Sequence, residues 1–276
     1  MVRWGNLLSM TFHCSNGISQ GGQLSPLLYN VYTDDLNYHL QATGVGCYVG
    51  GAWVNSLSYV DDMVLLAPTV TALQTLLEVC RAYAGPQDIV HNTMTTVCML
   101  VWPKQSQGQF STRVRLGNEL SFAEEFHYLG RIMTADCRDD KDIKKQFRRQ
   151  NALGNMLVRK FSFAPIDANI QLFKSYFYPI HGFARWCHSL QNSIRKHTVS
   201  YSDTFKHLIN VPRYTSSSLE FALNATDHTN VVFPKFAYSL MNRVIPSPNS
   251  IVTAIVNSYA YHQSPLMDKW ESMLYV

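Results

Sequence analysis

The sequence has 276 residues, a net charge of +4 and 46% hydrophobic residues, enough apolar material to fill the core of one large domain or two small ones. This composition excludes a disordered chain, and the longest uninterrupted apolar run, Met63–Pro68, is far shorter than the roughly 20 residues that span a bilayer. No basic and apolar leader opens the sequence and its cysteines are widely spaced, so we expect an intracellular protein with free thiols, in the nucleus or the cytoplasm, without a membrane.

The charge is distributed unevenly along the chain. Residues 1–100 contain 2 basic and 6 acidic side chains, residues 101–200 contain 16 and 8, and residues 201–276 contain 5 of each. The basic middle third suits a polyanionic partner, although basic residues on a helix are more often a solvated face.

A first acidic pair, Asp34 and Asp35, follows a predicted helix. Apolar residues recur at near-helical spacing after Pro26, which suits a first helical turn, at Leu24, Leu28, Val31 and Leu36. The two aspartates are therefore expected near the end of this helix. Because successive helical side chains diverge by about 100°, these carboxylates cannot converge on one ion, and we expect solvated surface charges.

A second acidic pair, Asp61 and Asp62, lies between two short apolar runs at residues 53–60 and 63–67. This pattern predicts a β-hairpin with the acids at its tip. Adjacent carboxylates repel each other unless a cation neutralises them, which favours a divalent metal site. The alternative is an ordinary Asp-rich hairpin turn.

A basic helix is predicted around residues 140–160. Ile143, Phe147 and Leu157 fall on one helical side, while Lys144, Lys145, Arg148 and Arg149 make two like-charged pairs four residues apart. A phosphate backbone along the helix would relieve this repulsion, and a solvated face is the alternative. Asp139 and Asp140 precede the helix as cap and dipole partners.

Several segments together resemble the palm and thumb motifs of reverse transcriptases, most closely those of non-LTR (LINE-type) retrotransposons. In chain order they are NGISQGGQLSPLLYNVY (residues 16–32), YVDD (59–62), FHYLG (126–130), KDIKKQFRRQNALGNMLVRKF (141–161) and NVPRYTS (210–216). The resemblance covers residues 2–214. It implies an α+β fold in which a partial polymerase palm, an antiparallel sheet with helices, precedes a helical thumb and a helical C-terminal extension. We expect the partial palm at 1–103, a link and primer-grip hairpin at 104–135, a thumb-like region at 136–190 and the extension at 191–276.

The resemblance also implies RNA-directed DNA polymerisation by two-metal nucleotidyl transfer, with Mg²⁺, or Mn²⁺ in its place, as cofactor. The partners would be an RNA template, a DNA primer and deoxynucleotides. The implied sites are the catalytic metal ligands Asp61 and Asp62, the template and substrate contacts Gln20, Gly21, Gly22 and Tyr59, the primer grip Phe126, His127, Tyr128, Leu129 and Gly130, and the nucleic-acid contacts Lys144, Lys145, Arg148 and Arg149. Read alone, the grip aromatics would be core residues, and the glycines a plain turn.

The sequence departs from the family at three places. The family takes a further carboxylate from a strand before Gln20, whereas residues 1–19 contain no Asp or Glu; Thr95 occupies the place of a lysine, and Ser19 that of a basic residue. We therefore expect this chain alone to be inactive, with an upstream fragment carrying the fingers and the first aspartate. The alternative is a vestigial protein that binds nucleic acid without catalysis.

Overall fold

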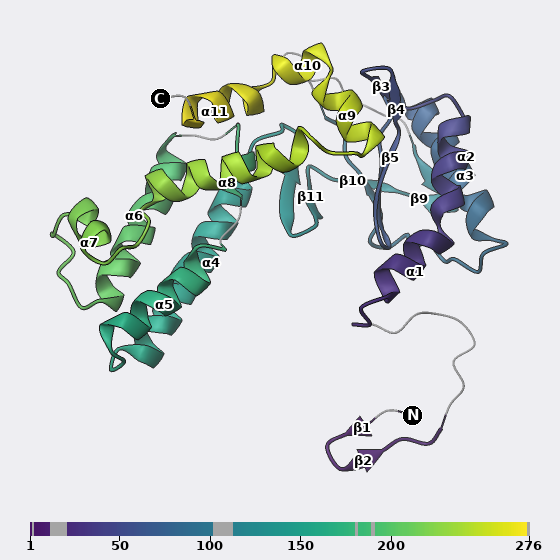
Figure 1. The fold of residues 1–276 in the computed structure, drawn as a ribbon. Coiled ribbons are helices and arrows are strands. Elements are labelled where there is room, and N and C mark those ends of the chain that lie inside the picture. The colour runs from purple at the N-terminus through teal and green to yellow at the C-terminus, as the bar shows by residue number, and fades with distance from the viewer. Residues whose placement is uncertain (2, 12–20, 102–112, 180–181, 189–190, 275–276) are drawn as a thin grey trace. The chain divides into compact units, whose positions relative to one another are not determined.

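The computed structural model describes residues 1, 3–11, 21–101, 113–179, 182–188 and 191–274 (Figure 1). As predicted, they form an α+β fold, with many helices and short strand pairs that are mostly antiparallel. Contacts divide the chain into two compact units, residues 1–47 with 53–91 and residues 48–52 with 92–276. Within the described ranges, no helix is both long enough and apolar enough to cross a membrane.

The first unit packs two helices against one strand of a hairpin. Its elements are β1 (Arg3–Trp4), β2 (Leu7–Leu8), α1 (Ser25–Tyr32), α2 (Asp34–Ala42), β5 (Ser56–Tyr59), β6 (Asp62–Leu65) and α3 (Val70–Ala84). Strands β3 (Cys47–Val49) and β4 (Ala52–Val54) are divided between the two units. Leu36 and Leu40 of α2 and Leu76 and Cys80 of α3 are buried together, and residues of β6 pack against them. Each helix thus contributes a pair of apolar residues four positions apart, the spacing that places side chains on one face.

The segment predicted as one helix forms two, α1 and α2. Thr33 separates them with non-helical torsions, and its hydroxyl donates to the Tyr29 carbonyl at 3.0 Å. Asp34 and Asp35 lie on a helix, as predicted, but in the first turn of α2, so the prediction that they end the first helix was wrong. The N-terminal end of a helix dipole favours negative charge, which explains why the acids begin α2. Helix α1 itself buries none of its residues.

The second unit contains two strand hairpins, a parallel strand pair and most of the helices. Its elements are β7 (Val97–Cys98), β8 (Arg115–Leu116), β9 (Asn118–Glu119), β10 (Ser121–Phe122), β11 (Glu125–Tyr128), β12 (Arg131–Thr134), α4 (Asp140–Phe161), α5 (Ile166–Phe177), η1 (Phe183–Arg185), α6 (Gln191–Leu208), α7 (Ser217–Leu223), α8 (Thr229–Val244), α9 (Ser250–Val256), α10 (Tyr259–His262) and α11 (Pro265–Leu274). Helices α4, α5 and α6 lie side by side (Figure 1). The finer division into palm, link, thumb and extension stays a prediction.

An aromatic cluster holds α5, α6 and α7 together. Phe173 stacks on Phe177 with ring centroids 4.6 Å apart, and Phe205 stacks on Phe221 at 4.3 Å. Tyr201 meets Phe173 edge to face at 4.9 Å. The pairs 173/177 and 201/205 are four residues apart, so each helix presents two rings on one face. This cluster is the largest of the buried clusters in the part of the chain that the structure describes.

Candidate functional site

The YVDD segment folds into a tight β-hairpin, which confirms the hairpin predicted around Asp61 and Asp62, while their role as metal ligands stays a prediction. Strands β5 and β6 pair antiparallel from Ser56 opposite Leu65 to Tyr59 opposite Asp62, so that Val60 and Asp61 form a two-residue turn. Val60 has a φ of +54°. A β-branched residue rarely adopts this left-handed conformation, which costs of the order of 1–3 kcal/mol and occurs mostly at functional sites.

Asp61 in the turn and Asp62 at the start of β6 are both exposed to solvent, and Tyr59, which pairs with Asp62, is 62% exposed. The charge at the turn acts on α1: burial raises the pKa of the Tyr29 hydroxyl, and the negative charge of Asp61 raises it further. Helix α1 therefore lies beside the turn, close enough for an electrostatic effect. The hairpin tip presents an aromatic surface next to two anionic oxygen donors.

The donor set at this turn is partial. Two carboxylates offer the hard oxygen ligands that Mg²⁺ and Mn²⁺ take in proteins. Among the residues that the structure describes, no three His, Cys, Asp or Glu side chains gather closely enough to hold a metal ion, so Asp34 and Asp35 do not join the hairpin pair. Those two act instead on Tyr83, whose pKa is raised first by burial and then by the charge of Asp35.

The glycine loop before α1 is described from Gly21 onward, and Gln20 lies outside the described residues. Gly21 has a φ of +80°, a conformation that glycine adopts without steric cost. The carbonyl of Gly22 accepts the amide of Ser25 at 3.2 Å and so begins the turn into α1. The positive φ of Gly21 suits both interpretations of this loop, a plain turn and a close approach of the backbone to a ligand.

The FHYLG segment forms a second hairpin, β11–β12, with Tyr128 opposite Arg131 and Phe126 opposite Met133. Leu129 and Gly130 form its turn, and both have positive φ, as the two-residue turns that match strand twist require. Phe126 and Tyr128 lie on one face with ring centroids 6.4 Å apart, and both are half-buried. His127 alternates to the other face and is exposed. A half-buried aromatic face is compatible with the predicted primer grip.

A buried acidic pair joins this hairpin to α4. Asp142, only 2% exposed, accepts the backbone amide of Ile132 at 3.1 Å and the indole N–H of Trp186 at 2.8 Å. Asp139, predicted as a helix cap, makes no cap hydrogen bond; its carboxylate instead binds the Arg131 guanidinium and accepts the His188 amide. Sequence reasoning missed Asp142, because nothing in its immediate neighbourhood distinguishes it from a surface helix acid.

Two lysines of α4 also contact the hairpin. Lys141 pairs with Glu125 at 2.5 Å, and the Lys145 ammonium donates to the Gly130 carbonyl at 3.0 Å. Lys145 is therefore partly engaged within the protein, whereas the three other predicted nucleic-acid contacts of α4, Lys144, Arg148 and Arg149, are exposed. Ile143 and Leu157 are buried and Phe147 is half-buried, as the helical pattern predicts. The basic and apolar faces of α4 are separate.

The comparisons with known proteins agree with these motifs. Residues 3–133 match the family described as "Reverse transcriptase (RNA-dependent DNA polymerase)". The chain is 40% identical over 152 residues to the "Retrovirus-related Pol polyprotein from type-2 retrotransposable element R2DM" of Drosophila melanogaster, an alignment that covers 51% of this chain and 14% of the relative. It is 30% identical over 126 residues to the "Retrovirus-related Pol polyprotein from type-1 retrotransposable element R2" of Nasonia vitripennis, covering 42% and 12%.

The chain thus spans less than a fifth of the length of these curated relatives. The predicted resemblance to reverse transcriptases of non-LTR retrotransposons is confirmed. Members of this family bind a nucleic-acid template and primer and generally use divalent metal ions. Residues 3–133 match the reverse transcriptase family, and the chain contains a partial reverse transcriptase domain homologous to the R2 non-LTR retrotransposon Pol proteins.

Proposed function

We propose that the chain supplies the metal-binding hairpin, the primer grip and the thumb of an RNA-directed DNA polymerase. One observation carries this proposal: within the matched residues, YVDD folds into a two-residue turn that exposes both carboxylates. The proposed partners are an RNA template, a DNA primer and deoxynucleotides, together with an upstream fragment that carries the fingers and a further aspartate.

Asp61 and Asp62 would hold Mg²⁺, or Mn²⁺ in its place. Bound there, two such ions would activate the primer hydroxyl and stabilise the leaving oxygen of an in-line displacement. The exposed Tyr59 ring would give the primer end an apolar surface to rest against, and the turn at Gly21 would let the backbone come close to the substrate.

The thumb would bind the primer–template duplex through the exposed cations of α4. Lys144, Arg148 and Arg149 are accessible to phosphates, while Lys145 holds the turn of the grip hairpin. Phosphate contacts of this kind position a duplex without reading its sequence. We therefore propose binding that depends on salt and is indifferent to base sequence.

Thr95 favours a second candidate function, that of a non-catalytic nucleic-acid-binding protein. Its hydroxyl donates to the Asn92 carbonyl at 3.3 Å. A hydroxyl bound in this way carries no positive charge, so it cannot neutralise a departing pyrophosphate as a lysine would. Binding of nucleic acid without turnover would follow if no other cation takes this role.

Metal binding at the hairpin can be measured without turnover. Titration with Mn²⁺, followed by the loss of its free paramagnetic signal, should show Asp61→Asn and Asp62→Asn each weakening binding at least tenfold, because each removes an anionic ligand. The double variant Asp34→Asn/Asp35→Asn, which removes a matched acidic pair on α2, should bind Mn²⁺ as the unaltered chain does. Equal affinity in the hairpin variants would contradict the proposal.

A primer-extension assay separates the two candidate functions. The 276-residue chain with Mg²⁺, primed RNA and deoxynucleotides should extend no primer above background. Adding a separately produced upstream polymerase segment of the Drosophila relative should produce extension that Asp61→Asn abolishes, and Thr95→Lys should increase the rate further. Extension by the unsupplemented chain would contradict the expected inactivity, and none in the supplemented reaction would favour the non-catalytic function.

A further inference from the structure

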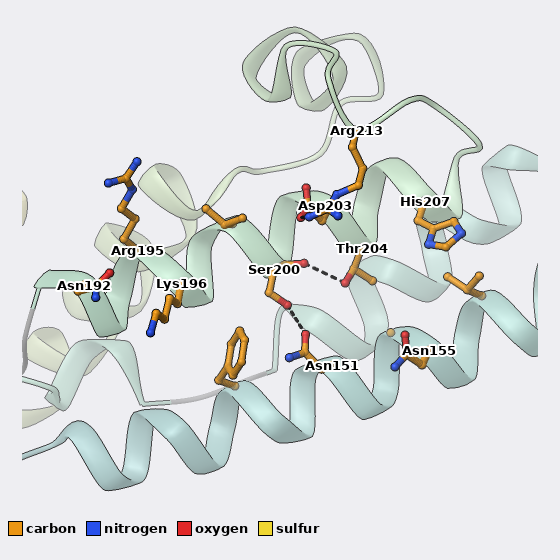
Figure 2. A pocket seen from close by; sticks show the side chains of 14 residues that line it. Asn151, Asn155, Asn192, Arg195, Lys196, Ser200, Asp203, Thr204, His207 and Arg213 are labelled. Atoms are coloured by element: carbon orange, nitrogen blue, oxygen red, sulfur yellow. Dashed lines mark hydrogen bonds and ion pairs between the residues drawn. The ribbon is translucent and has the colours of Figure 1, made fainter.

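A groove of about 650 Å³ runs between α4 and α6 in the second unit (Figure 2). The two helices come very close at Gly154, where a Cβ atom would lie 2.8 Å from the Thr204 side chain. A hydrogen bond from the Ser200 hydroxyl to the Asn151 side chain also joins the two walls (Figure 2). The groove is therefore a feature of close helix packing rather than of a loose contact.

The cations of this groove lie on α6 and on the segment that follows it. Arg195 and Lys196 occupy one end of the groove, and Arg213 lies with Asp203 and His207 at the other (Figure 2). Asp203, the acid of the lining, is paired with Arg213. Arg195 and Lys196 are exposed and make no ion pair with any residue that the structure describes. A net positive charge remains at the Arg195 end.

The α4 wall combines amides with cations. Asn151 and Asn155 line the groove one turn apart (Figure 2). Lys144 and Arg148 precede them at steps of four, three and four residues, which places all four on one stripe of the helix. Arg149 is turned about 100° from Arg148 and so lies on another face. One wall thus offers hydrogen-bonding amides, bordered by two cations.

A buried lysine fixes the segment that carries Arg213. Lys206 is 4% exposed, and its ammonium donates to the carbonyls of Arg213 at 2.9 Å and of Thr215 at 2.7 Å. The intervening Tyr214 is 90% exposed. The backbone on both sides of Tyr214 is thus held by Lys206, while the Tyr214 side chain is exposed to solvent.

We propose that the α4–α6 groove binds single-stranded nucleic acid, with phosphates on Arg195 and Lys196, bases on the amide wall and one base stacked on Tyr214. Sites for single strands combine a basic groove with aromatic rings that stack on exposed bases. Here the groove carries cations that make no ion pair within the described residues, and the exposed Tyr214 directly follows Arg213, which lines the groove. A duplex keeps its bases stacked internally and would leave the ring unused. An acidic peptide would use the cations but would not require an aromatic ring in this position.

This site extends the proposed function, because it holds a strand outside the polymerising hairpin, but it does not depend on turnover. Fluorescence anisotropy with a labelled oligouridylate of about 12 nucleotides measures it directly on the full chain. Arg195→Ala/Lys196→Ala should weaken binding about tenfold or more and lower the slope of log K against log salt by about 1.4, since each phosphate contact on a single strand contributes about 0.7.

A matched control removes two exposed cations outside the groove, as Lys160→Ala/Arg243→Ala, with the same change in net charge. This variant should bind the oligouridylate within about twofold of the unaltered chain, because general attraction alone changes little at physiological salt. Equal losses in the two double variants would overturn the site, since binding would then follow net charge.

Variants of Tyr214 distinguish base stacking from purely electrostatic binding. Tyr214→Ala should weaken oligouridylate binding about tenfold, whereas Tyr214→Phe, which keeps the ring, should not. No effect of Tyr214→Ala, or equally tight and equally Arg195-dependent binding of a polyglutamate peptide, would refute the proposal in favour of a general polyanion site. Mn²⁺ binding at Asp61 and Asp62 is independent of this groove, so failure here and failure of the proposed function are distinguishable.

Discussion

Replacing Asp142 by Asn should loosen the junction between the β11–β12 hairpin and α4. The two carboxylate oxygens accept one N–H each, from Ile132 at 3.1 Å and from Trp186 at 2.8 Å, and Asp142 also lies 4.0 Å from the Arg131 guanidinium. Asparagine keeps one acceptor oxygen and turns an NH₂ group toward the other donor. One hydrogen bond to a charged group is lost and one buried donor is left unpaired, while Asp139 still binds Arg131.

The expected loss follows from these contacts. A hydrogen bond to a charged group contributes about 1.5–3 kcal/mol, and an unpaired buried donor adds about 1–3 kcal/mol. Because the asparagine side chain can shift to share its remaining acceptor, we expect Asp142→Asn to lower the free energy of unfolding of the second unit by about 2–4 kcal/mol. Asp167→Asn, in the exposed first turn of α5, removes a helix-dipole contact alone and should cost less than about 1 kcal/mol.

Urea unfolding followed by tryptophan fluorescence reports on this unit through its buried Trp270 and Trp186. Amide hydrogen exchange at Ile132 reports on the hydrogen bond itself and should accelerate in the Asp142 variant and not in the Asp167 variant. A change below about 1 kcal/mol in Asp142→Asn, with unaltered exchange at Ile132, would show that this carboxylate does not hold the hairpin.

Three further predictions concern other parts of the chain. Burial lowers the pKa of His197 to about 4, so the unfolded chain binds a proton below about pH 6.5 that the folded chain does not bind. The free energy of unfolding should therefore fall by about 3 kcal/mol between pH 6.5 and pH 4. In urea unfolding at a series of pH values, His197→Gln should remove this decrease and His262→Gln, at an exposed position, should keep it. Val60→Gly should raise the melting temperature of the first unit, because relief of the +54° φ outweighs the entropy of glycine by about 1 kcal/mol; a lower melting temperature would argue against strain. Replacing three exposed cations of α4 by alanine, as Lys144→Ala/Arg148→Ala/Arg149→Ala, should reduce the salt slope of RNA–DNA duplex binding by about 3, and an unchanged slope would remove these three residues from the duplex interface.

The sequence predicted those parts of the site whose signal is local. Two short apolar runs on either side of Asp61 and Asp62 predict a hairpin whatever surrounds it. The β11–β12 hairpin was expected only from the resemblance of FHYLG to a primer grip, because its residues read alone suggest core positions. The break at Thr33 was missed, because apolar spacing continues across it into α2 and hides the change of helix. The spacing of apolar residues alone does not reveal a single non-helical residue such as Thr33.

The features that sequence reasoning missed are set by packing between distant residues. Asp142 resembles any acid in a helical first turn until Trp186 and Ile132 are brought to it by the fold. Arg195 stands some 40 positions from Asn151, and only the contact of α4 with α6 makes the two line one groove. The only local signal was the adjacent pair Arg195 and Lys196 in the basic third of the chain. This pair does not indicate which helix lies opposite it.

The β11–β12 hairpin is attached to α4 at one end of that helix. All the contacts described between them come from the start of the helix, at Asp139, Lys141, Asp142 and Lys145, while α4 continues to Phe161. Its 22 residues rise about 1.5 Å each, roughly 33 Å in all, so a tilt of about 10° at the hairpin moves the far end by about 6 Å. A small change in the angle between the β11–β12 hairpin and α4 would therefore displace the opposite end of the helix by about the width of a side chain.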